Sequence, residues 1–144
     1  MMIIRQLSVF LENKPGRLCA ATDALAREGI NLSALTVADT SEFGILRLIV
    51  DQPDRAKEIL AKAGVVARLT DVLAVAMDDA PGGAVGILHL LSDAGLNIEY
   101  MYACVGKDSG KAIMIVRTDD TELAANILHR GGYGDVNPAE IYRL

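Results

Sequence analysis

Polar residues able to hold a small zwitterion surround Pro15-Gly16. Asn13 and Lys14 precede this pair, and Arg17 follows it. A proline near the start of a segment favours the first turn of a helix, and the free amides of that turn can hold a carboxylate. An asparagine side chain can accept a hydrogen bond from an ammonium group and donate one to a carboxylate. Glycine at this point leaves room for close approach of the backbone.

The same pattern occurs twice in the chain. A shift of 66 residues relates Pro15-Gly16 to Pro81-Gly82. The shift also relates pairs of apolar, glycine and asparagine residues: Leu25 and Leu91, Gly29 and Gly95, Asn31 and Asn97, Ile49 and Ile115, Val50 and Val116. A fixed period indicates repeated structural units. We therefore expect two units, residues 1–70 and 71–144, which pack against each other because each is small.

The two copies are not chemically equal. Asp79 takes the place of Asn13, and Gly83 takes the place of Arg17. An aspartate can pair with an ammonium group but repels a carboxylate. The first copy is therefore the better candidate for binding a carboxylate.

Residues for other chemistry are few. His89 and His129 fall within expected helices, with no neighbouring Cys, Ser or carboxylate motif, and we interpret both as helix-surface residues. Cys19 and Cys104 do not have the spacing of metal ligands, and we expect two reduced thiols in a cytoplasmic protein. We expect no catalytic residue, metal site or cofactor.

Two pairs of carboxylates need a separate interpretation. Asp78-Asp79 and Asp119-Asp120 each precede an expected helix. Negative charge is favourable at a helix N-terminus. Helix capping is therefore the main alternative to a catalytic or binding role.

Composition excludes several classes of protein. The net charge of −5 argues against nucleic acid as a partner, because nucleic-acid binding depends on Lys and Arg. The start of the chain becomes polar too early for a signal peptide, and the apolar runs are too short to span a bilayer. With 51% hydrophobic residues the chain can form a packed core. We expect a cytoplasmic protein with no membrane contact.

Hydrophobic periodicity predicts the same element order in both copies. The first copy has strands at 3–12, 31–39, 44–50 and 65–69, with a turn at 40–42 and helices ending at Gly29 and Gly64. The second has strands at 72–77, 97–105, 111–117 and near Ile141, with helices ending at Gly95 and Gly131. This order predicts an α+β fold of two ferredoxin-like βαββαβ units, each an antiparallel sheet with helices on one face. The units should join into an eight-stranded sheet, and further self-association, such as a homodimer, would cover the remaining edges.

The stretch Phe10–Leu18, followed by Glu28–Leu32, resembles the ACT domain. The second copy shows the pattern as Asp79–Gly82 and then Ala94–Ile98, so the resemblance covers the whole chain as two units in tandem. It implies a non-catalytic regulatory module that binds a small effector, most often an amino acid. ACT units occur attached to metabolic enzymes, as separate regulatory subunits and as stand-alone tandem proteins. This chain resembles the stand-alone kind.

The resemblance also implies where the effector binds. In ligand-binding pairs the loop after the first strand of one unit faces the start of the second strand of the other. Asn13 would then face Asn97, and Asp79 would face Asn31. The implied contact residues are Leu11, Asn13, Lys14, Gly16, Arg17, Leu18, Asn31, Leu32, Asp79, Asn97, Ile98, Tyr100 and Met101. Many serine-binding members have a histidine where this chain has Leu11, a departure from the serine pattern.

Other interpretations of these residues and of the protein stay open. Asn31 and Asn97 each follow a glycine that ends a helix and can be turn residues only. The Pro-Gly pairs can simply start helices, and Tyr100 can serve packing at a strand edge. The protein itself could instead be a regulatory subunit that binds an amino-acid metabolic enzyme without a ligand of its own. An enzyme using the same cleft is a third alternative.

Overall fold

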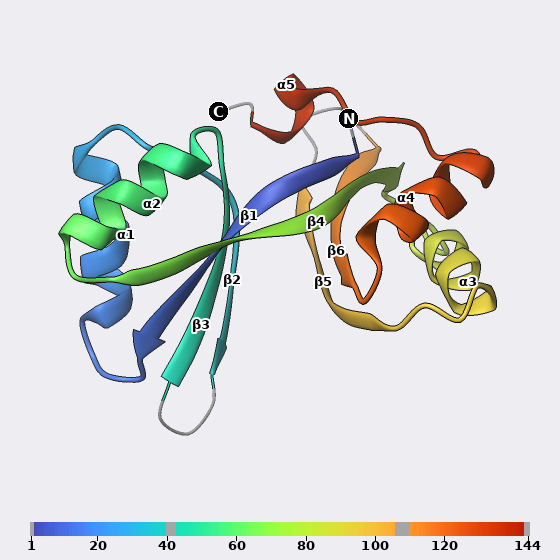
Figure 1. The fold of residues 1–144 in the computed structure, drawn as a ribbon. Helices are drawn as coiled ribbons and strands as arrows, with labels where there is room; N and C mark the ends of the chain where they lie inside the picture. The colour runs from blue at the N-terminus through green and yellow to red at the C-terminus, as the bar shows by residue number, and fades with distance from the viewer. Residues whose placement is uncertain (1, 40–42, 106–109, 143–144) are drawn as a thin grey trace. The chain divides into compact units, whose positions relative to one another are not determined.

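The computed structural model describes residues 2–39, 43–105 and 110–142 (Figure 1). The chain divides into two compact units. We call Arg5–Thr70 the N-unit, and Asp71–Arg143 together with Met1–Ile4 the C-unit. Each unit is a mixed α/β structure in which helices pack on an antiparallel sheet. No helix in the described part of the chain is both long and apolar enough to cross a membrane.

The N-unit has the order strand, helix, two strands, helix, strand. Its elements are β1 (Ile3–Glu12), α1 (Arg17–Arg27), β2 (Leu32–Asp39), β3 (Phe43–Val50), α2 (Pro53–Lys62) and the first part of β4 (Val66–Asp78). Strand β3 lies between β1 and β2 and pairs antiparallel with both, so that Leu48 is opposite Leu7 and Leu35. The expected turn at 40–42 lies outside the described residues.

Every second residue of β1 from Leu7 to Leu11 lies in the N-unit core. Leu7 and Val9 are fully buried on the face that α1 and α2 cover. Helix α1 ends where Gly29 takes a positive φ of 73°, and Ile30 N then donates to Leu25 O at 3.0 Å, a glycine-terminated helix end. The core consists of Leu7, Val9, Leu11, Ala21, Leu25, Ile30, Leu46, Leu48, Val50, Ala56 and Leu60.

The C-unit repeats most of this plan. It contains the second part of β4, then α3 (Val85–Asp93), β5 (Ile98–Val105), β6 (Lys111–Thr118), α4 (Thr121–Arg130) and the short α5 (Pro138–Ile141). Strand β6 lies between β4 and β5 and pairs antiparallel with both. The aliphatic core consists of Met2, Leu73, Val75, Ile87, Leu91, Met114, Val116, Ala124, Ala125 and Leu128.

Strands β1 and β4 each contribute to both units. Within the N-unit, Ser8 Oγ lies 3.2 Å from Thr70 Oγ1. Within the C-unit, Ala74 N donates to Met2 O at 2.8 Å. The start of β1 therefore provides the fourth strand of the C-unit. The order of hydrogen-bonded strands is β2-β3-β1-β4-β6-β5.

This sharing corrects two predictions from sequence. The described residues form six strands rather than eight, because β4 runs without interruption where strands at 65–69 and 72–77 were expected. No glycine or proline separates Leu69 from Val72, so nothing breaks the strand. The strand expected near Ile141 is instead α5, which Asn137 caps by accepting a hydrogen bond from Ala139 N at 3.0 Å.

Candidate functional site

The loop between β1 and α1 gathers most of the polar residues implicated by sequence. Lys14 N donates to Glu12 O at 2.8 Å, and Arg17 N donates to Lys14 O at 3.3 Å. Gly16 has a φ of 86° and is the N-cap residue of α1. A side chain is rarely accommodated at this φ, which explains the glycine. Asn13 and its neighbours through Arg17 are exposed.

Three charged side chains of this loop interact. Lys14 Nζ lies 3.1 Å and Arg17 Nη2 lies 3.9 Å from Glu12 Oε2. The hydrogen bond from Lys14, aided by the charges of Lys14 and Arg17, lowers the pKa of Glu12. Two cations share one carboxylate, so the loop carries net positive charge.

The first turn of α1 has no anionic or side-chain cap. Gly16 offers no capping side chain, and the turn contains no acidic residue. Helix α4 shows the contrast, because Asp120 accepts a hydrogen bond from Leu123 N at 3.1 Å. Capping thus accounts for Asp120, as the sequence suggested. Amide hydrogens at the uncapped start of α1, next to Lys14 and Arg17, favour an anionic group.

The start of β2 lies at the other end of α1. Asn31 is exposed, whereas Leu32 packs against the N-unit core. The 11 residues of α1 span about 16 Å. Asn13 and Asn31 of one unit are therefore not brought together, and Leu11, only 8% exposed, is a core residue.

A strand irregularity at the same place in both copies was missed from sequence. The pairing of β2 with β3 shifts register between Leu32 and Ala34. The pairing of β5 with β6 shifts register between Ile98 and Tyr100, which are their counterparts 66 residues later. β-bulges re-aim side chains and are frequent beside functional sites. The residues themselves carry no glycine or proline that would have signalled the bulge.

The loop of the C-unit differs from that of the N-unit. Asp79 is exposed, and its N–H donates to Gly110 O at 2.8 Å. A Cβ on Gly83 would overlap with Asp78 O, so this residue must be glycine. Helix α3 starts only at Val85, and Asp78 pairs with Lys111 Nζ. Neither Asp78 nor Asp79 caps this helix, contrary to the capping interpretation.

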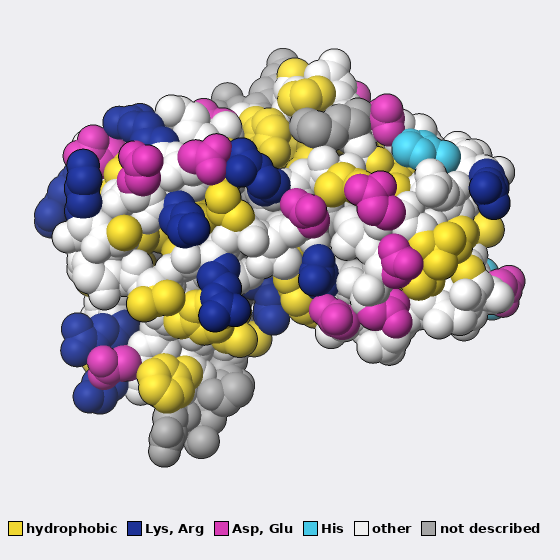
Figure 2. Space-filling view, viewed as in Figure 1, with side chains coloured by type: hydrophobic (Ala, Val, Ile, Leu, Met, Phe, Trp, Pro, Cys, Tyr) yellow, Lys and Arg dark blue, Asp and Glu magenta, His cyan; other side chains and the backbone are white. Residues whose placement is uncertain are grey.

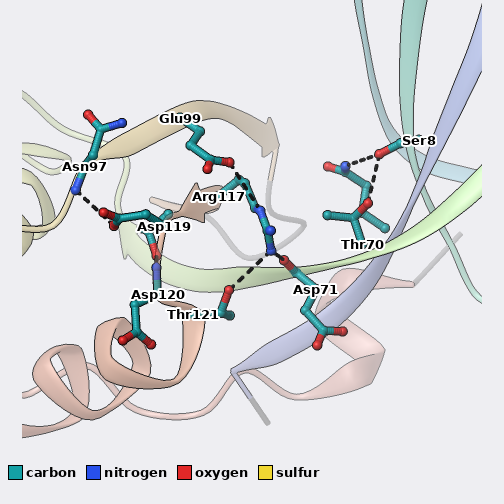
Figure 3. Close-up of polar contacts among 11 residues, drawn as sticks. Ser8, Thr70, Asp71, Asn97, Glu99, Arg117, Asp119, Asp120 and Thr121 are labelled. Carbon is teal, nitrogen blue, oxygen red and sulfur yellow. Dashed lines mark hydrogen bonds and ion pairs between the residues drawn. The ribbon is translucent and has the colours of Figure 1, made fainter.

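Asn97 is tied through its backbone to the β6–α4 turn. Asn97 N donates to Asp119 Oδ1 at 3.2 Å, and Asp119 N donates to Asn97 O at 3.3 Å. Figure 3 shows the amide group of Asn97 pointing away from Asp119. The backbone of Asn97 is held while its side-chain amide stays available.

Arg117 joins three segments of the C-unit close to Asn97 (Figure 3). Its Nε lies 3.4 Å from Glu99 Oε2, and its Nη1 donates to Asp71 O at 2.7 Å and to Thr121 Oγ1 at 3.4 Å. Glu99 lies within the bulge of β5. The bulge is therefore anchored to β4 and α4 by a half-buried guanidinium.

The remaining implicated residues differ in their exposure. Ile98 and Met101 pack against the C-unit core, and Tyr100 is half-buried opposite Arg117 on β6. Leu18 in α1 is 40% exposed. Of these apolar candidates, Leu18 offers the most accessible surface beside the β1–α1 loop.

Among the described residues, the two histidines and Cys104 lie outside the β1–α1 loop. His89 is exposed, and His129 Nε2 lies 2.8 Å from Asp135 Oδ1 in an exposed pair that lowers the pKa of Asp135. Burial raises the pKa of the Cys104 thiol. Across residues 2–39, 43–105 and 110–142, no three His, Cys, Asp or Glu side chains cluster as metal ligands would.

A family model described as an ACT domain pair matches residues 2–136. The crystal structure of protein BT0572 from Bacteroides thetaiotaomicron is 37% identical, with a TM-score of 0.90, over 99% of this chain and 98% of that chain. No curated protein sequence gives a significant match to this chain.

Two further solved structures share the fold at lower identity. The regulatory subunit of aspartate kinase from Thermus thermophilus, in its ligand-free form, has a TM-score of 0.64 and 19% identity over 92% of this chain and 98% of that chain. The corresponding subunit from Thermus flavus has a TM-score of 0.59 and 19% identity, over 91% and 97%.

Proposed function

Since this chain belongs to the family of ACT domain pairs, we propose that it is a non-catalytic regulatory protein whose effector is an amino acid. The two repeats of the sequence are residues 1–70 and 71–144, and the first residues of the first repeat belong to the C-unit. The effector binds where units meet, between the β1–α1 loop of one unit and the start of the second strand of another. Binding favours one packing of the units over others and so changes what the protein does to a partner.

The uncapped first turn of α1 is the observation that carries this proposal. It has no acidic residue and no capping side chain, and Lys14 and Arg17 lie beside it. The α-carboxylate of an amino acid would accept hydrogen bonds from this turn, and Asn13 would contact the effector from the same loop.

Asn97 supplies the other half of the proposed site. Its backbone is fixed by Asp119, and its side-chain amide is available to the ammonium or carboxylate group of the effector. Ile98, Tyr100 and Met101 follow on β5 and would form apolar walls, together with Leu18 and Leu32. The reciprocal site, formed by Asp79 and Asn31, should bind the effector more weakly, because Asp79 repels a carboxylate.

A homodimer in the cytoplasm is part of the proposal. Strand β2 is an end strand in the hydrogen-bonding order, and residues 32–38 carry no charge. Leu35 and Val37 on this strand are 53% and 48% exposed. An uncharged edge strand with exposed apolar side chains favours pairing with a second copy.

The partner we propose is an enzyme of amino-acid metabolism. Two structures that share the fold are regulatory subunits of aspartate kinase. An effector-responsive subunit of this kind controls an enzyme by changing its own assembly or contacts.

The test is calorimetric titration of the purified protein with amino acids, comparing wild type with Asn13→Ala. We expect at least one amino acid to bind wild type, and the variant to lose about tenfold or more in affinity, equivalent to about 1.4 kcal/mol. Asn126→Ala removes an exposed asparagine from α4 and is the matched control. Equal affinity in wild type and Asn13→Ala would disprove the proposed site.

A second candidate, a partner-binding subunit without a ligand, is favoured by exposed apolar side chains of the N-unit. Phe10, Phe43 and Val66 are 39%, 52% and 65% exposed, and Arg68 lies 5.8 Å from the Phe10 ring. Figure 2 shows hydrophobic side chains gathered near the β1–β3 end of this unit. Co-purification with an enzyme, without any response to amino acids, would support this candidate over the effector-binding protein.

A further inference from the structure

A hollow of about 380 Å³ lies between α1 and α2 of the N-unit. Ala24 from α1 and Ile59 and Ala63 from α2 provide its apolar lining, and charged side chains from both helices complete it. The volume falls within the range of about 300–1,000 Å³ for small-molecule sites. The hollow is made within one unit and does not involve the β1–α1 loop.

The repeat explains why the hollow exists here. Leu90 holds the place of Ala24 in the second copy, 66 residues later. Gly131 and Ala63 are the C-cap residues of α4 and α2. Leu90 lies so close to Gly131 that a Cβ on residue 131 would overlap with its Cδ1 atom. The larger side chain packs into this position of the C-unit, whereas two alanines leave it open in the N-unit.

The charges around the hollow are predominantly positive. Arg55 Nη2 lies 3.3 Å from Glu28 Oε2, which leaves Arg27, Lys62 and Glu58 as the other charged lining residues. In the described part of the chain, neither Arg27 nor Lys62 has an ion-pair partner. Two cations against one carboxylate remain to attract an anion. Figure 2 shows basic and acidic side chains intermingled over the helices of this unit.

The second copy keeps only part of this charge pattern, because Arg130 ends α4 as Lys62 ends α2. Asp93 stands where Arg27 stands in the first copy. Leu123 is the third residue of α4, as Arg55 is the third residue of α2. The open hollow therefore occurs in the copy that has a cation at both positions, Arg27 and Lys62.

From this coincidence we propose that the α1–α2 hollow binds a small organic carboxylate. The carboxylate groups pair with Arg27 and Lys62, and the carbon chain lies against Ala24 and Ile59. A guanidinium and an ammonium group on opposite helices suit a short dicarboxylate. This site is separate from the amino-acid site at Asn13 and does not depend on it.

The test is a titration of the ¹⁵N-labelled full chain with succinate and with glutarate, followed by amide chemical shifts. We expect saturable shifts centred on Ala24 and Ile59. Ala24→Leu, which copies the second unit, should abolish them. Lys62→Gln should weaken binding about tenfold, and Lys57→Gln, an exposed change on the same helix outside the hollow, should not.

The outcomes are decisive in either direction. Asn13→Ala should leave these shifts unchanged, so failure of the proposed effector site would not affect this result. Absence of localised shifts with both acids would overturn the proposal. So would wild-type binding by both Ala24→Leu and Lys62→Gln, or equally tight binding of inorganic phosphate, which would indicate a site for any anion.

Discussion

Asn97 and Asp119 hold each other through two hydrogen bonds, Asn97 N to Asp119 Oδ1 at 3.2 Å and Asp119 N to Asn97 O at 3.3 Å. The first residue before β5 is thereby fixed to the turn that leads into α4. The bulge of β5 comes directly after Asn97 in the chain, and Arg117 on β6 anchors this bulge. A half-site built on this turn would present the Asn97 side chain from a rigid support.

Asp119→Ala should therefore loosen the start of β5. Loss of one acceptor reduces the free energy of unfolding by about 0.5–1.5 kcal/mol. Asp119→Asn keeps an acceptor oxygen in the same place and should retain most of this stability. Urea unfolding of both variants measures the difference, and equal losses would show that the hydrogen bond contributes nothing.

Met2→Ala should destabilise the C-unit, although Met2 lies at the opposite end of the sequence. Met2 is 3% exposed and belongs to the C-unit core. Truncation of a buried methionine costs about 2–5 kcal/mol. Hydrogen exchange should show lost protection in β6 and the second part of β4. Arg5→Ala, a nearby exposed change in β1, should have a much smaller effect. Loss of protection confined to β2 and β3 would contradict this account.

The sequence predicted those features of the fold that depend on local pattern. Alternation placed Leu7 and Val9 inside, and Gly29 ended α1 as expected. The sharing of β1 and β4 could not be predicted, because Met2 and Ala74 meet only through the topology of the chain. A strand near Ile141 was expected to fill the place that the start of β1 takes.

Prediction of the site was limited because part of the site depends on pairing between strands that are distant in sequence. The uncapped turn at Gly16 follows from residue types. The bulges at Leu32/Ala34 and Ile98/Tyr100 depend on the register between strands, which sequence spacing does not specify. The pairing of Asn13 with Asn97 stays a prediction.

Gly83→Ala should destabilise the loop before α3. The added Cβ would overlap with the backbone oxygen of Asp78, which cannot move without distorting the loop. Overpacking of this kind costs about 1–3 kcal/mol. Gly134→Ala is the control, because a Cβ there meets nothing within 4 Å. Thermal unfolding of the two variants should separate them, and equal midpoints would refute the steric argument.

Glu12 should titrate below the usual range for a glutamate. The hydrogen bond from Lys14 is the main cause of the lowered pKa. Because the folded-state pKa is lowered, the pair stabilises the protein above the usual carboxyl range, and this contribution is lost as pH falls through the folded-state pKa. Lys14→Met should raise the Glu12 pKa, measured by NMR titration, whereas Lys57→Met should leave it unchanged. An unaltered pKa in Lys14→Met would contradict the assignment.

Thermal unfolding against all twenty amino acids at millimolar concentration, for wild type and Asn13→Ala in parallel, tests the central claim most directly. An effector at 100 times its Kd stabilises the native state by about 2.7 kcal/mol, a shift of several degrees. We predict that one or a few related amino acids raise the midpoint of wild type and fail to raise that of Asn13→Ala. If no amino acid shifts wild type, or if both proteins respond equally, the proposed effector site is wrong.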